Sequence, residues 1–417
     1  MNSGSRLNVL VAGGGVAGLE VLLALRDLAG DRVELTLLEP SSEFVFRPMA
    51  TAETFGRGRG QRIKTSKIAA DTGATLVPGA LAAVDDARRR VTVDNGDELR
   101  YDALVIATGA RSEPAFRRGI TWTPETDPEV FGGLRRDLEE GYAHSVAFVI
   151  PPGTAWPLPA YELALMTAWD ADGMGQDDVQ ISVVTPEQGP LAIFGPAGSA
   201  AVQADLDEAG VTVRTGAYVE ETSDPSGFVV MPGGDRLDAA HVVALPRAVG
   251  PNIPGVPSDA NGFIRVDRHC HVDGAERLWA AGDAIAFPVK QGGLAAQQAD
   301  AAAEDIARMS GADVAAQTFK PVLRGMLLTG RGRSWMRAEI TGGGGEAVAE
   351  RHALWWPPTK VAGRYLAPYL HETFESSHAE GAEAPSGLPV ELDLERELEQ
   401  AADELRSGAQ ATVGRDA

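Results

Sequence analysis

The stretch VLVAGGGVAGLEVLLAL, residues 9–25, decides the fold of this chain. A short apolar run, Leu7–Ala12, leads into three glycines, and helical apolar spacing continues from Val16 to Leu28. The glycines therefore fall at a turn between a strand and a helix. Val33–Leu38 is typical of a second strand, and this βαβ opening predicts a parallel sheet with helices on its faces.

The glycine spacing in this turn predicts a site for a dinucleotide. Gly13 allows the tight turn, Gly15 lets a pyrophosphate approach the backbone, and Gly18 lets the helix pack closely on the strand. The helix N-terminus then offers free N–H groups and the positive end of its dipole to the phosphates. Glu39 ends the second strand roughly 20 residues beyond the glycines, where a carboxylate accepts hydrogen bonds from a ribose. This pattern by itself suits either FAD or NAD.

The composition favours a multidomain globular protein. The chain has 417 residues, which predicts two or three domains, and 44% hydrophobic residues, which supply a large core. With 59 acidic and 37 basic residues the net charge is -22, which disfavours nucleic-acid binding. No apolar stretch reaches the roughly 20 residues of a membrane span, and no secretory signal pattern opens the sequence, so we expect a cytoplasmic protein.

The rest of the chain continues as alternating strands and helices. Thr75–Val84 and Arg90–Val93 predict strands, with a hairpin turn at Asp94–Glu98, and Thr51–Gly60 has the composition of a mobile loop. A second α/β region follows, and its expected elements are Ser145–Pro152, Ala160–Trp169, Gln180–Thr185, Ser199–Ala209 and Val211–Thr215. A strand and turn at Leu278–Asp283, an Ala- and Gln-rich helix at Gly293–Met309, a small partly β region from Thr318 and a surface helix at Leu392–Leu405 complete the expected elements.

Three blocks in fixed order carry a resemblance to a known family. They are VLVAGGGVAGLEVLLAL, YDALVIATGA at Tyr101–Ala110 and RLWAAGDAIA at Arg277–Ala286. Over residues 7–310 the chain resembles the two-dinucleotide-domain flavoproteins of the pyridine nucleotide-disulfide oxidoreductase superfamily. The resemblance implies an α/β fold with two Rossmann-like domains, the second inserted in the first, and a small C-terminal α+β domain. The implied boundaries are 1–110 with 250–310 for the FAD domain, 111–249 for the second nucleotide-binding-like domain, 311–380 for the C-terminal domain and 381–417 for an acidic, partly helical tail.

The same resemblance implies FAD as the cofactor and assigns residues to it. In that superfamily the second block closes the FAD domain and the third places an aspartate near the flavin's ribityl chain or pyrophosphate. The implied contacts are Gly13, Gly15, Val16, Ala17, Gly18, Glu39, Arg47, Ala80, Ala107, Thr108, Gly109, Gly282, Asp283, Lys290, Gly293 and Leu294.

Within the superfamily, the chain is most similar to sulfide:quinone oxidoreductases, flavocytochrome sulfide dehydrogenases and type II NADH dehydrogenases. SSEFVFRPMATAE at Ser41–Glu53 resembles the loop after their ribose acid, and KQGGLAAQQAD at Lys290–Asp300 resembles their flavin-proximal loop and helix. In such proteins this helix N-terminus faces the pyrimidine carbonyl of the flavin and stabilises the anionic reduced form. Lys290 is then a candidate catalytic residue beside the ring, and the alternative is a solvated lysine before a helix.

Two departures from the family pattern bear on the chemistry. The chain has one cysteine, Cys270, so neither a disulfide nor the two-thiol cycle of sulfide oxidation is available. Its neighbours, His269 and His271, offer too few ligands for a metal, and adjacent side chains point to opposite faces of a strand, so we expect no metal site and a packed or edge position for Cys270. Where an NADH-using relative has a second glycine turn, this chain has Pro151 and Pro152, which lack N–H groups, and only Gly153.

These observations predict a two-electron FAD oxidoreductase with a small-molecule donor and a quinone-like or protein acceptor. The alternatives are an NAD(P)H dehydrogenase with a noncanonical nicotinamide site and a flavin-binding regulatory protein without turnover. Trp355 and Trp356 suit either a quinone or membrane contact or a hydrophobic staple for the C-terminal domain. The sequence does not decide between a monomer and a homodimer, and it leaves room for a peripheral membrane contact.

Overall fold

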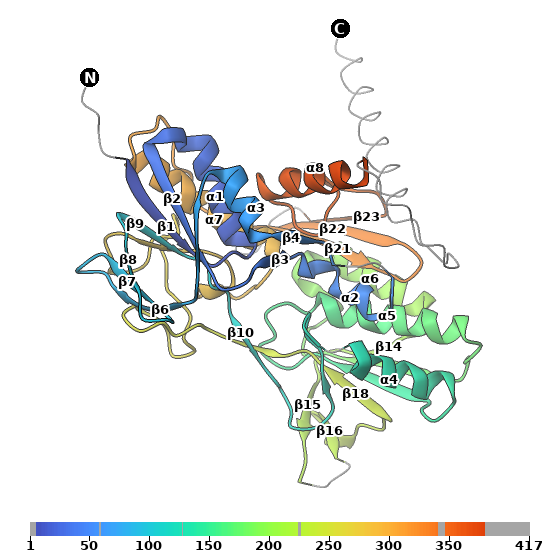
Figure 1. Ribbon diagram of the computed structural model, residues 1–417. Helices are drawn as coiled ribbons and strands as arrows, with labels where there is room; N and C mark the ends of the chain where they lie inside the picture. The colour runs from blue at the N-terminus through green and yellow to red at the C-terminus, as the bar shows by residue number, and fades with distance from the viewer. Residues whose placement is uncertain (1–5, 58–59, 127, 224–226, 341–346, 380–417) are drawn as a thin grey trace.

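A five-stranded parallel sheet organises the N-terminal part of the molecule (Figure 1). The computed structural model describes residues 6–57, 60–126, 128–223, 227–340 and 347–379, and the structural statements below concern these residues. The strand order is β20-β9-β1-β2-β5, and β1 pairs in parallel with both β2 and β9. The strands are β1 (Leu7–Ala12), β2 (Val33–Glu39), β5 (Thr75–Pro78), β9 (Ala103–Ile106) and β20 (Leu278–Ala280). The βαβ opening predicted from the glycine stretch is therefore confirmed.

Both faces of this sheet are covered, which is why its strands are apolar on both sides. Helices α1 (Val16–Ala29) and α7 (Gly292–Met309) pack together over one face, with α3 (Thr65–Thr72) beside them (Figure 1). Buried alanines of α7 keep its surface smooth enough for close packing against α1. An antiparallel meander covers the other face, and its strands are β6 (Leu81–Asp85), β7 (Arg90–Val93) and β8 (Glu98–Arg100).

The second α/β unit repeats the plan of the first. Its parallel sheet has the order β11-β18-β12-β13-β14. The chain enters this unit through β10 (Arg111–Glu113) and leaves it through β19 (Arg247–Val249), and these two strands pair antiparallel. The second unit is thus inserted between β9 and β20 of the first, as the resemblance implies. Its elements are β11 (Ile120–Thr121), α4 (Pro128–Glu139), β12 (Ser145–Val149), α5 (Leu158–Gly173), β13 (Gln180–Val184), α6 (Gly195–Glu208), β14 (Thr212–Arg214), β18 (His241–Ala244) and the meander β15 (Tyr218–Glu221), β16 (Phe228–Met231) and β17 (Asp235–Arg236).

A small C-terminal sheet lies between helix α8 (Leu366–Ala379) and helices α5 and α6 (Figure 1). Its antiparallel strands are β21 (Val322–Leu328), β22 (Arg333–Glu339) and β23 (Ala347–Glu350). Strand β21 is at the edge, and polar side chains of the neighbouring helices satisfy its backbone. Gln297 bonds both the N–H and the carbonyl of Val322, at 2.9 and 2.8 Å. The edge is therefore closed to another strand.

Three local expectations are wrong. The loop expected over Thr51–Gly60 begins in a short helix, α2 (Ala50–Thr54), which follows a hairpin strand β3 (Glu43–Val45) that pairs with β4 (Arg62–Lys64). The single strand expected over Thr75–Val84 is two strands, because Gly79 has φ +145° and turns the chain between them. Cys270 is not in a strand but in a turn with φ +60°. The helix expected at Leu392–Leu405 lies outside the described residues.

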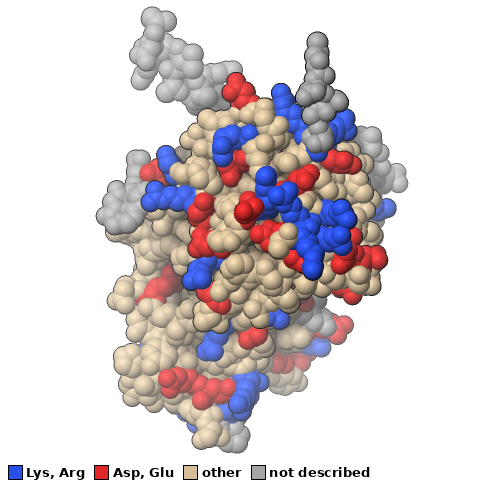
Figure 2. Space-filling view, turned by 90° about the vertical axis from the view of Figure 1, so that its left-hand side faces the viewer, with Lys and Arg blue, Asp and Glu red and all other residues tan. Residues whose placement is uncertain are grey.

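Acidic and basic side chains alternate over the face shown in Figure 2. In the β6–β8 meander, for example, Arg88 pairs with Asp85 at 3.0 Å and Arg90 pairs with Glu98 at 2.5 Å. These arginines are therefore locally compensated. Within the described part of the chain, no helix combines the length and the apolar character that crossing a membrane requires.

Candidate functional site

The glycine turn after β1 has the geometry of a phosphate cradle. Gly13 has φ +108°, and a Cβ there would lie 2.3 Å from the carbonyl oxygen of Ala107. A Cβ on Gly18 would lie 1.8 Å from the carbonyl oxygen of Gly13. A Cβ on Gly15, in contrast, would have no atom within 4 Å. Two glycines are thus required by the protein's own backbone, and the third faces open space at the start of α1, where an anion could approach.

Glu39 is held beside this turn. Its Oε2 accepts a hydrogen bond from the Gly14 N–H at 2.5 Å, and its Oε1 accepts one from the Ser41 N–H at 2.8 Å. The Gly79 N–H donates to the Glu39 carbonyl oxygen at 3.3 Å, which brings Ala80 to the same end of the sheet. The Ala80 N–H in turn donates to Asp94 Oδ1 at 3.1 Å. Backbone donors therefore fix the carboxylate where the ribose acid is expected.

The other two sequence blocks, Tyr101–Ala110 and Arg277–Ala286, lie against the same glycine turn. The Ala107 N–H donates to the Ala12 carbonyl oxygen at 2.8 Å, so the Ala107–Gly109 exit from β9 lies against the glycine turn. A Cβ on Gly282, which has φ +77°, would lie 3.0 Å from the Cβ of Ala17. Gly282 also donates its N–H to Gln298 Oε1 at 2.8 Å. Sequence reasoning missed Gln298, whose only signal is its place in the Gln-rich helix, as the seventh residue of α7.

Asp283 and Lys290 are partly buried and interact electrostatically. Burial raises the pKa of Asp283, and the positive charge of Lys290 opposes that shift. Burial lowers the pKa of Lys290 to about 8, and the carboxylates of Asp283 and Asp259 oppose that shift. The Lys290 ammonium donates to the Ile285 carbonyl oxygen and lies 4.0 Å from the centre of the Phe263 ring. The Lys290 side chain is thus partly buried and packed against Phe263, and its place beside a flavin stays a prediction.

Helix α7 begins beside this pair with a capped first turn. Gln291 Oε1 accepts the Leu294 N–H at 2.9 Å, and Gln291 Nε2 donates to the Arg324 carbonyl oxygen at 3.1 Å. A Cβ on Gly292 would lie 2.7 Å from Val361, so the C-terminal segment passes directly over this turn. Sequence reasoning placed Gly293 and Leu294 here but missed Gln291, because glutamine is not among the residues that usually cap a helix N-terminus.

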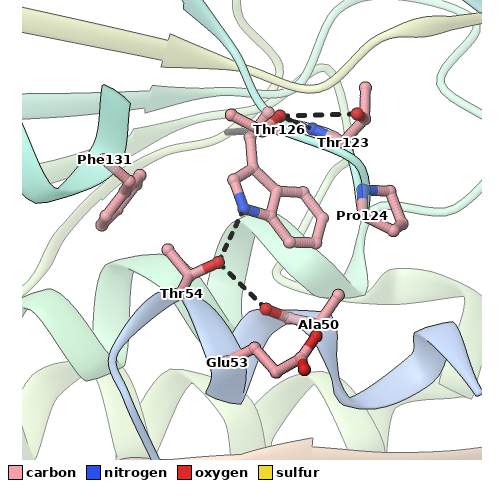
Figure 3. A pocket seen from close by; sticks show the side chains of 8 residues that line it. Ala50, Glu53, Thr54, Thr123, Pro124, Thr126 and Phe131 are labelled. Carbon is pink, nitrogen blue, oxygen red and sulfur yellow. Dashed lines mark hydrogen bonds between the residues drawn. The ribbon is translucent and has the colours of Figure 1, made fainter. Parts of the chain in front are cut away.

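Arg47 forms a surface ion pair with the inserted unit. Its guanidinium pairs with Glu125 at 2.8 Å, and the two side chains are 62% and 52% exposed. Residues close in sequence to this pair line the pocket in Figure 3, where Ala50, Glu53 and Thr54 of α2 face Thr123 and Pro124. The Trp122 Nε1–H donates to Thr54 Oγ1 at 3.1 Å across this pocket. The structure therefore links Arg47 to the inserted unit, and its contact with a cofactor stays a prediction.

A buried ion pair joins the inserted unit to the C-terminal segment. The Lys360 ammonium lies 2.6 and 2.7 Å from the two carboxylate oxygens of Glu162, and these side chains are 6% and 1% exposed. The same carboxylate accepts Thr51 Oγ1–H at 2.6 Å and the Leu328 N–H at 2.9 Å. Burial lowers the pKa of Lys360, and Glu162 opposes that shift. The sequence has no local signal for this pair, because 198 residues separate its members.

The two tryptophans differ in role. Trp355 is buried, stacks edge-on against Trp335 at 4.7 Å and donates its Nε1–H to the Thr359 carbonyl oxygen at 2.9 Å. Trp356 is 46% exposed and lies 5.3 Å from the His371 ring. Trp355 therefore fits the hydrophobic staple of the C-terminal domain. Of the two, Trp356 is the one exposed enough to contact a quinone or a membrane surface.

The turn after β12 differs from the glycine cradle. The Ile150 N–H donates to the Val184 carbonyl oxygen at 2.9 Å, as the Gly13 N–H does to Leu38, so the two turns start in the same register. By that register Thr185 occupies the place of Glu39. The nearby Glu187 is turned inward, where its carboxylate accepts Tyr161 O–H at 2.7 Å and Thr185 Oγ1–H at 3.0 Å. Burial raises the pKa of Glu187, as expected for an internal carboxyl.

Comparison with known proteins identifies the family. The profile of the pyridine nucleotide-disulphide oxidoreductases matches residues 7–137 and 160–305, which is more than half of the chain. The chain belongs to this family.

Several members resemble the chain. A sulfide-quinone reductase of Aquifex aeolicus is 28% identical over 46% of this chain and 45% of its own length. An NADH dehydrogenase-like protein of Mycobacterium tuberculosis is 29% identical over 54% of this chain and 58% of its own length, so the alignments span about half of these relatives. The solved sulfide:quinone oxidoreductase of Aquifex aeolicus superposes with a TM-score of 0.73 at 20% identity, covering 90% of this chain and 91% of that one. These findings confirm the fold class and the superfamily.

Cys270 departs from the disulphide chemistry in the family's name. It is the only cysteine of the chain and is fully buried. Burial raises the pKa of its thiol to about 12, with a smaller contribution from the charge of Asp267. Because the thiolate is the reactive form, this cysteine is inert at neutral pH.

Proposed function

We propose that this family member is an FAD-dependent oxidoreductase that passes two electrons from a small-molecule donor to a quinone-like or protein acceptor. The observation that carries the proposal is the open cradle at Gly15, closed on its other sides by the backbones of Gly13, Gly18 and Ala107. The family binds a dinucleotide at such a turn, and the residues present fit one. When bound, FAD supplies the electron chemistry, and the protein supplies binding, orientation and electrostatics.

The residues of the first unit divide the binding task. The N–H groups at the start of α1 would face the pyrophosphate, and Glu39 would accept hydrogen bonds from the ribose. Asp283 and the capped start of α7 would lie along the flavin half. Burial lowers the pKa of Lys290 to about 8, so its positive charge is lost as the pH rises through that value. A cation beside the ring favours negative charge on it.

The donor is proposed to be something other than NAD(P)H. The turn after β12 holds Pro151 and Pro152, which offer no N–H to a phosphate, and Thr185 stands where an acid would bind a ribose. Glu187 does not substitute for that acid, because Tyr161 and Thr185 already occupy it. Electron transfer to the flavin through a thiol is equally disfavoured, since Cys270, the only cysteine in the sequence, is buried and its pKa is raised.

The nature of the acceptor rests on the relatives. One is a sulfide-quinone reductase, and another, a probable ferredoxin reductase of Castellaniella defragrans, is 28% identical over 69% of this chain and 70% of its own length. A quinone and a small redox protein are therefore the two acceptor classes to test.

The test is the visible spectrum of the purified protein, followed by anaerobic reduction. We expect flavin bands near 450 nm, no bleaching by NADH or NADPH at about millimolar concentration, and bleaching by dithionite that a quinone analogue reverses. A colourless protein that cannot take up FAD would overturn the proposal.

A second candidate is an NAD(P)H dehydrogenase, favoured by the similarity to the NADH dehydrogenase-like protein of Mycobacterium tuberculosis. Rapid bleaching of the flavin by NADH would establish it and would place the nicotinamide outside the standard turn. A flavin that dithionite reduces but that no quinone or protein acceptor reoxidises would instead indicate a regulatory flavoprotein.

A further inference from the structure

The segment Lys360–Leu366, here called the strap, connects the inserted unit to the first unit. At its start the Lys360 ammonium lies 2.6 and 2.7 Å from the two carboxylate oxygens of Glu162 in α5. The residue before it is also held, because the Trp355 Nε1–H donates to the Thr359 carbonyl oxygen at 2.9 Å. The strap therefore begins at a fixed, buried point of the inserted unit.

The other end of the strap is anchored on the first unit. The N–H groups of Tyr365 and Leu366 donate to the two carboxylate oxygens of Glu20, at 2.8 and 2.7 Å. Glu20 is the fifth residue of α1 and Glu162 the fifth residue of α5, and both are fully buried. Gly363 also lies against this anchor, because a Cβ on it would be 2.5 Å from Glu20 Oε2. Equivalent glutamates of the repeated fold thus hold the two ends of the strap.

Between the two anchors, Val361 packs against the first turn of α7. Its side chain is buried and belongs to the same apolar cluster as Ala17 of α1 and Ala295 of α7. A Cβ on Gly292 would lie 2.7 Å from Val361 Cγ2 but 3.7 Å from Val361 Cβ. The Val361 backbone is fixed as well, since Thr359 Oγ1–H donates to its carbonyl oxygen at 2.7 Å. The methyl groups of Val361 are therefore what holds the start of α7 at its distance from the strap.

The turn that Val361 contacts carries the free N–H groups of α7. Gln291 Oε1 accepts the Leu294 N–H at 2.9 Å, which leaves the N–H groups of Gly292 and Gly293 without an intrahelical acceptor. These groups are the positive end of the helix dipole and favour negative charge placed before them. Because this effect falls off within one turn, it depends on where the turn stands.

We propose that Val361 is a positioning residue of the flavin reaction. Held through the strap by Glu162 and Glu20, it fixes the first turn of α7 where the helix dipole stabilises the negative charge of the reduced flavin. The effect on the flavin rests on the proposed function, whereas the contact between Val361 and α7 does not. A displacement of about 1 Å at such a support can lower a rate roughly a hundredfold, although the support touches no reacting atom.

The contact is tested in the full-length apoprotein by a double-mutant cycle of Gly292→Ala and Val361→Ala, followed by urea denaturation. Gly292→Ala should destabilise the wild type, because the new methyl group collides with Val361 Cγ2. In the Val361→Ala background the same methyl group meets only the remaining Cβ at 3.7 Å, so Gly292→Ala should no longer destabilise the protein. The helix propensity of alanine cancels in the cycle. Equal losses in the two backgrounds would refute the contact.

The positioning role is tested by the midpoint potential of bound FAD, measured by anaerobic titration against a reference dye. Val361→Ala should weaken binding of reduced relative to oxidised FAD by about three- to tenfold, which lowers the potential of a two-electron couple by about 15–30 mV. Gly363→Ala should lower it as well, because its methyl group displaces the strap at Glu20 without touching α7. The double variant of Gly292→Ala with Val361→Ala should return toward the wild-type potential.

Gly173→Ala is the matched control, since it adds a methyl group in open space at the last residue of α5. It should keep the wild-type potential, and circular dichroism checks that each variant is folded. Wild-type potentials in both Val361→Ala and Gly363→Ala would refute the positioning role, even if the cycle in the apoprotein shows the contact. If the wild type takes up no FAD, the proposed function fails and the role toward the flavin fails with it, while the cycle still decides whether Val361 holds α7.

Discussion

Gly13, Gly15 and Gly18 of the first turn have different surroundings, so we expect different results when they are substituted. At Gly18 a methyl group would collide with the backbone of Gly13, so a substitution there disturbs the fold itself. At Gly15 the same methyl group would meet nothing in the protein. Gly15 therefore separates cofactor binding from folding.

We predict that Gly15→Ala weakens FAD binding at least about tenfold, which corresponds to about 1.4 kcal/mol, because the methyl group occupies the space of a phosphate. The unfolding free energy of the apoprotein should change by no more than about 1 kcal/mol. Flavin fluorescence titration and urea denaturation measure the two effects. Gly132→Ala, at a helical site in α4 that is equally open, is the control and should bind FAD normally. Equal affinity in the two variants would show that the cradle does not hold the cofactor.

Cys270 gives a second prediction at this scale. Cys270→Ala should retain the full turnover of the wild type, whichever donor is found, because a buried neutral thiol takes no part in electron transfer. In the native protein at pH 8, a thiol reagent should label Cys270 only after denaturant is added. Fast labelling of the native protein, or loss of turnover in the variant, would reinstate thiol chemistry.

At the scale of elements, the C-terminal sheet depends on the helices of both units. Carbonyl oxygens of β21 accept hydrogen bonds from Gln297 of α7 and from Gln291, the residue that caps this helix. The Leu328 N–H of β21 donates to Glu162 of α5. Glu162 also neutralises Lys360 in the interior. Helices α5 and α7 therefore hold the C-terminal sheet in place, in addition to packing on the parallel sheets of their own units.

We predict that Glu162→Ala destabilises the protein by about 3–5 kcal/mol, because it leaves Lys360 buried and unpaired. The double variant Glu162→Leu with Lys360→Met should recover much of this loss, since no buried charge remains. Urea denaturation of the single and double variants measures the coupling. A double variant as unstable as Glu162→Ala would show that the hydrogen bonds to Thr51 and Leu328, and not the charge pair, carry the effect.

For the whole molecule, buried carboxyl groups determine how stability depends on pH. The pKa values of Glu20, Glu187, Asp283 and Asp300 are all raised in the fold. An unfolded carboxyl titrates near pH 4, so above that pH the native state holds more protons than the unfolded state. Stability from these groups is complete below about pH 4 and is lost as the pH rises through their native pKa values.

We therefore predict that the unfolding free energy of the apoprotein falls between pH 5.5 and 8. One extra proton in the native state corresponds to a slope of about 1.4 kcal/mol per pH unit. Asp300→Asn should flatten this slope, because an amide does not titrate. Chemical denaturation in a single buffer series measures it. A slope that is identical in the wild type and in Asp300→Asn would mean that Asp300 is ionised in the native state at neutral pH.

The sequence by itself determined the parallel sheet, the glycine cradle with Glu39, the inserted second unit and the absence of a cysteine pair. These features are readable because they depend on local spacing: apolar periodicity, glycines at a turn, and an acid one strand later. Even the replacement of the second glycine turn by prolines is visible in the residues alone.

Only the tertiary structure decided what the buried acids do. Glu20 and Glu162 look like ordinary helical glutamates in the sequence, and their partners Leu366 and Lys360 lie 346 and 198 residues away. Arg47, expected at the cofactor, pairs with Glu125, and Lys290, which could have been solvated, is partly buried near Asp283. The physical reason is that burial, and not residue type, sets whether a charged group is solvated, paired or protonated, and burial comes only from segments that meet in space.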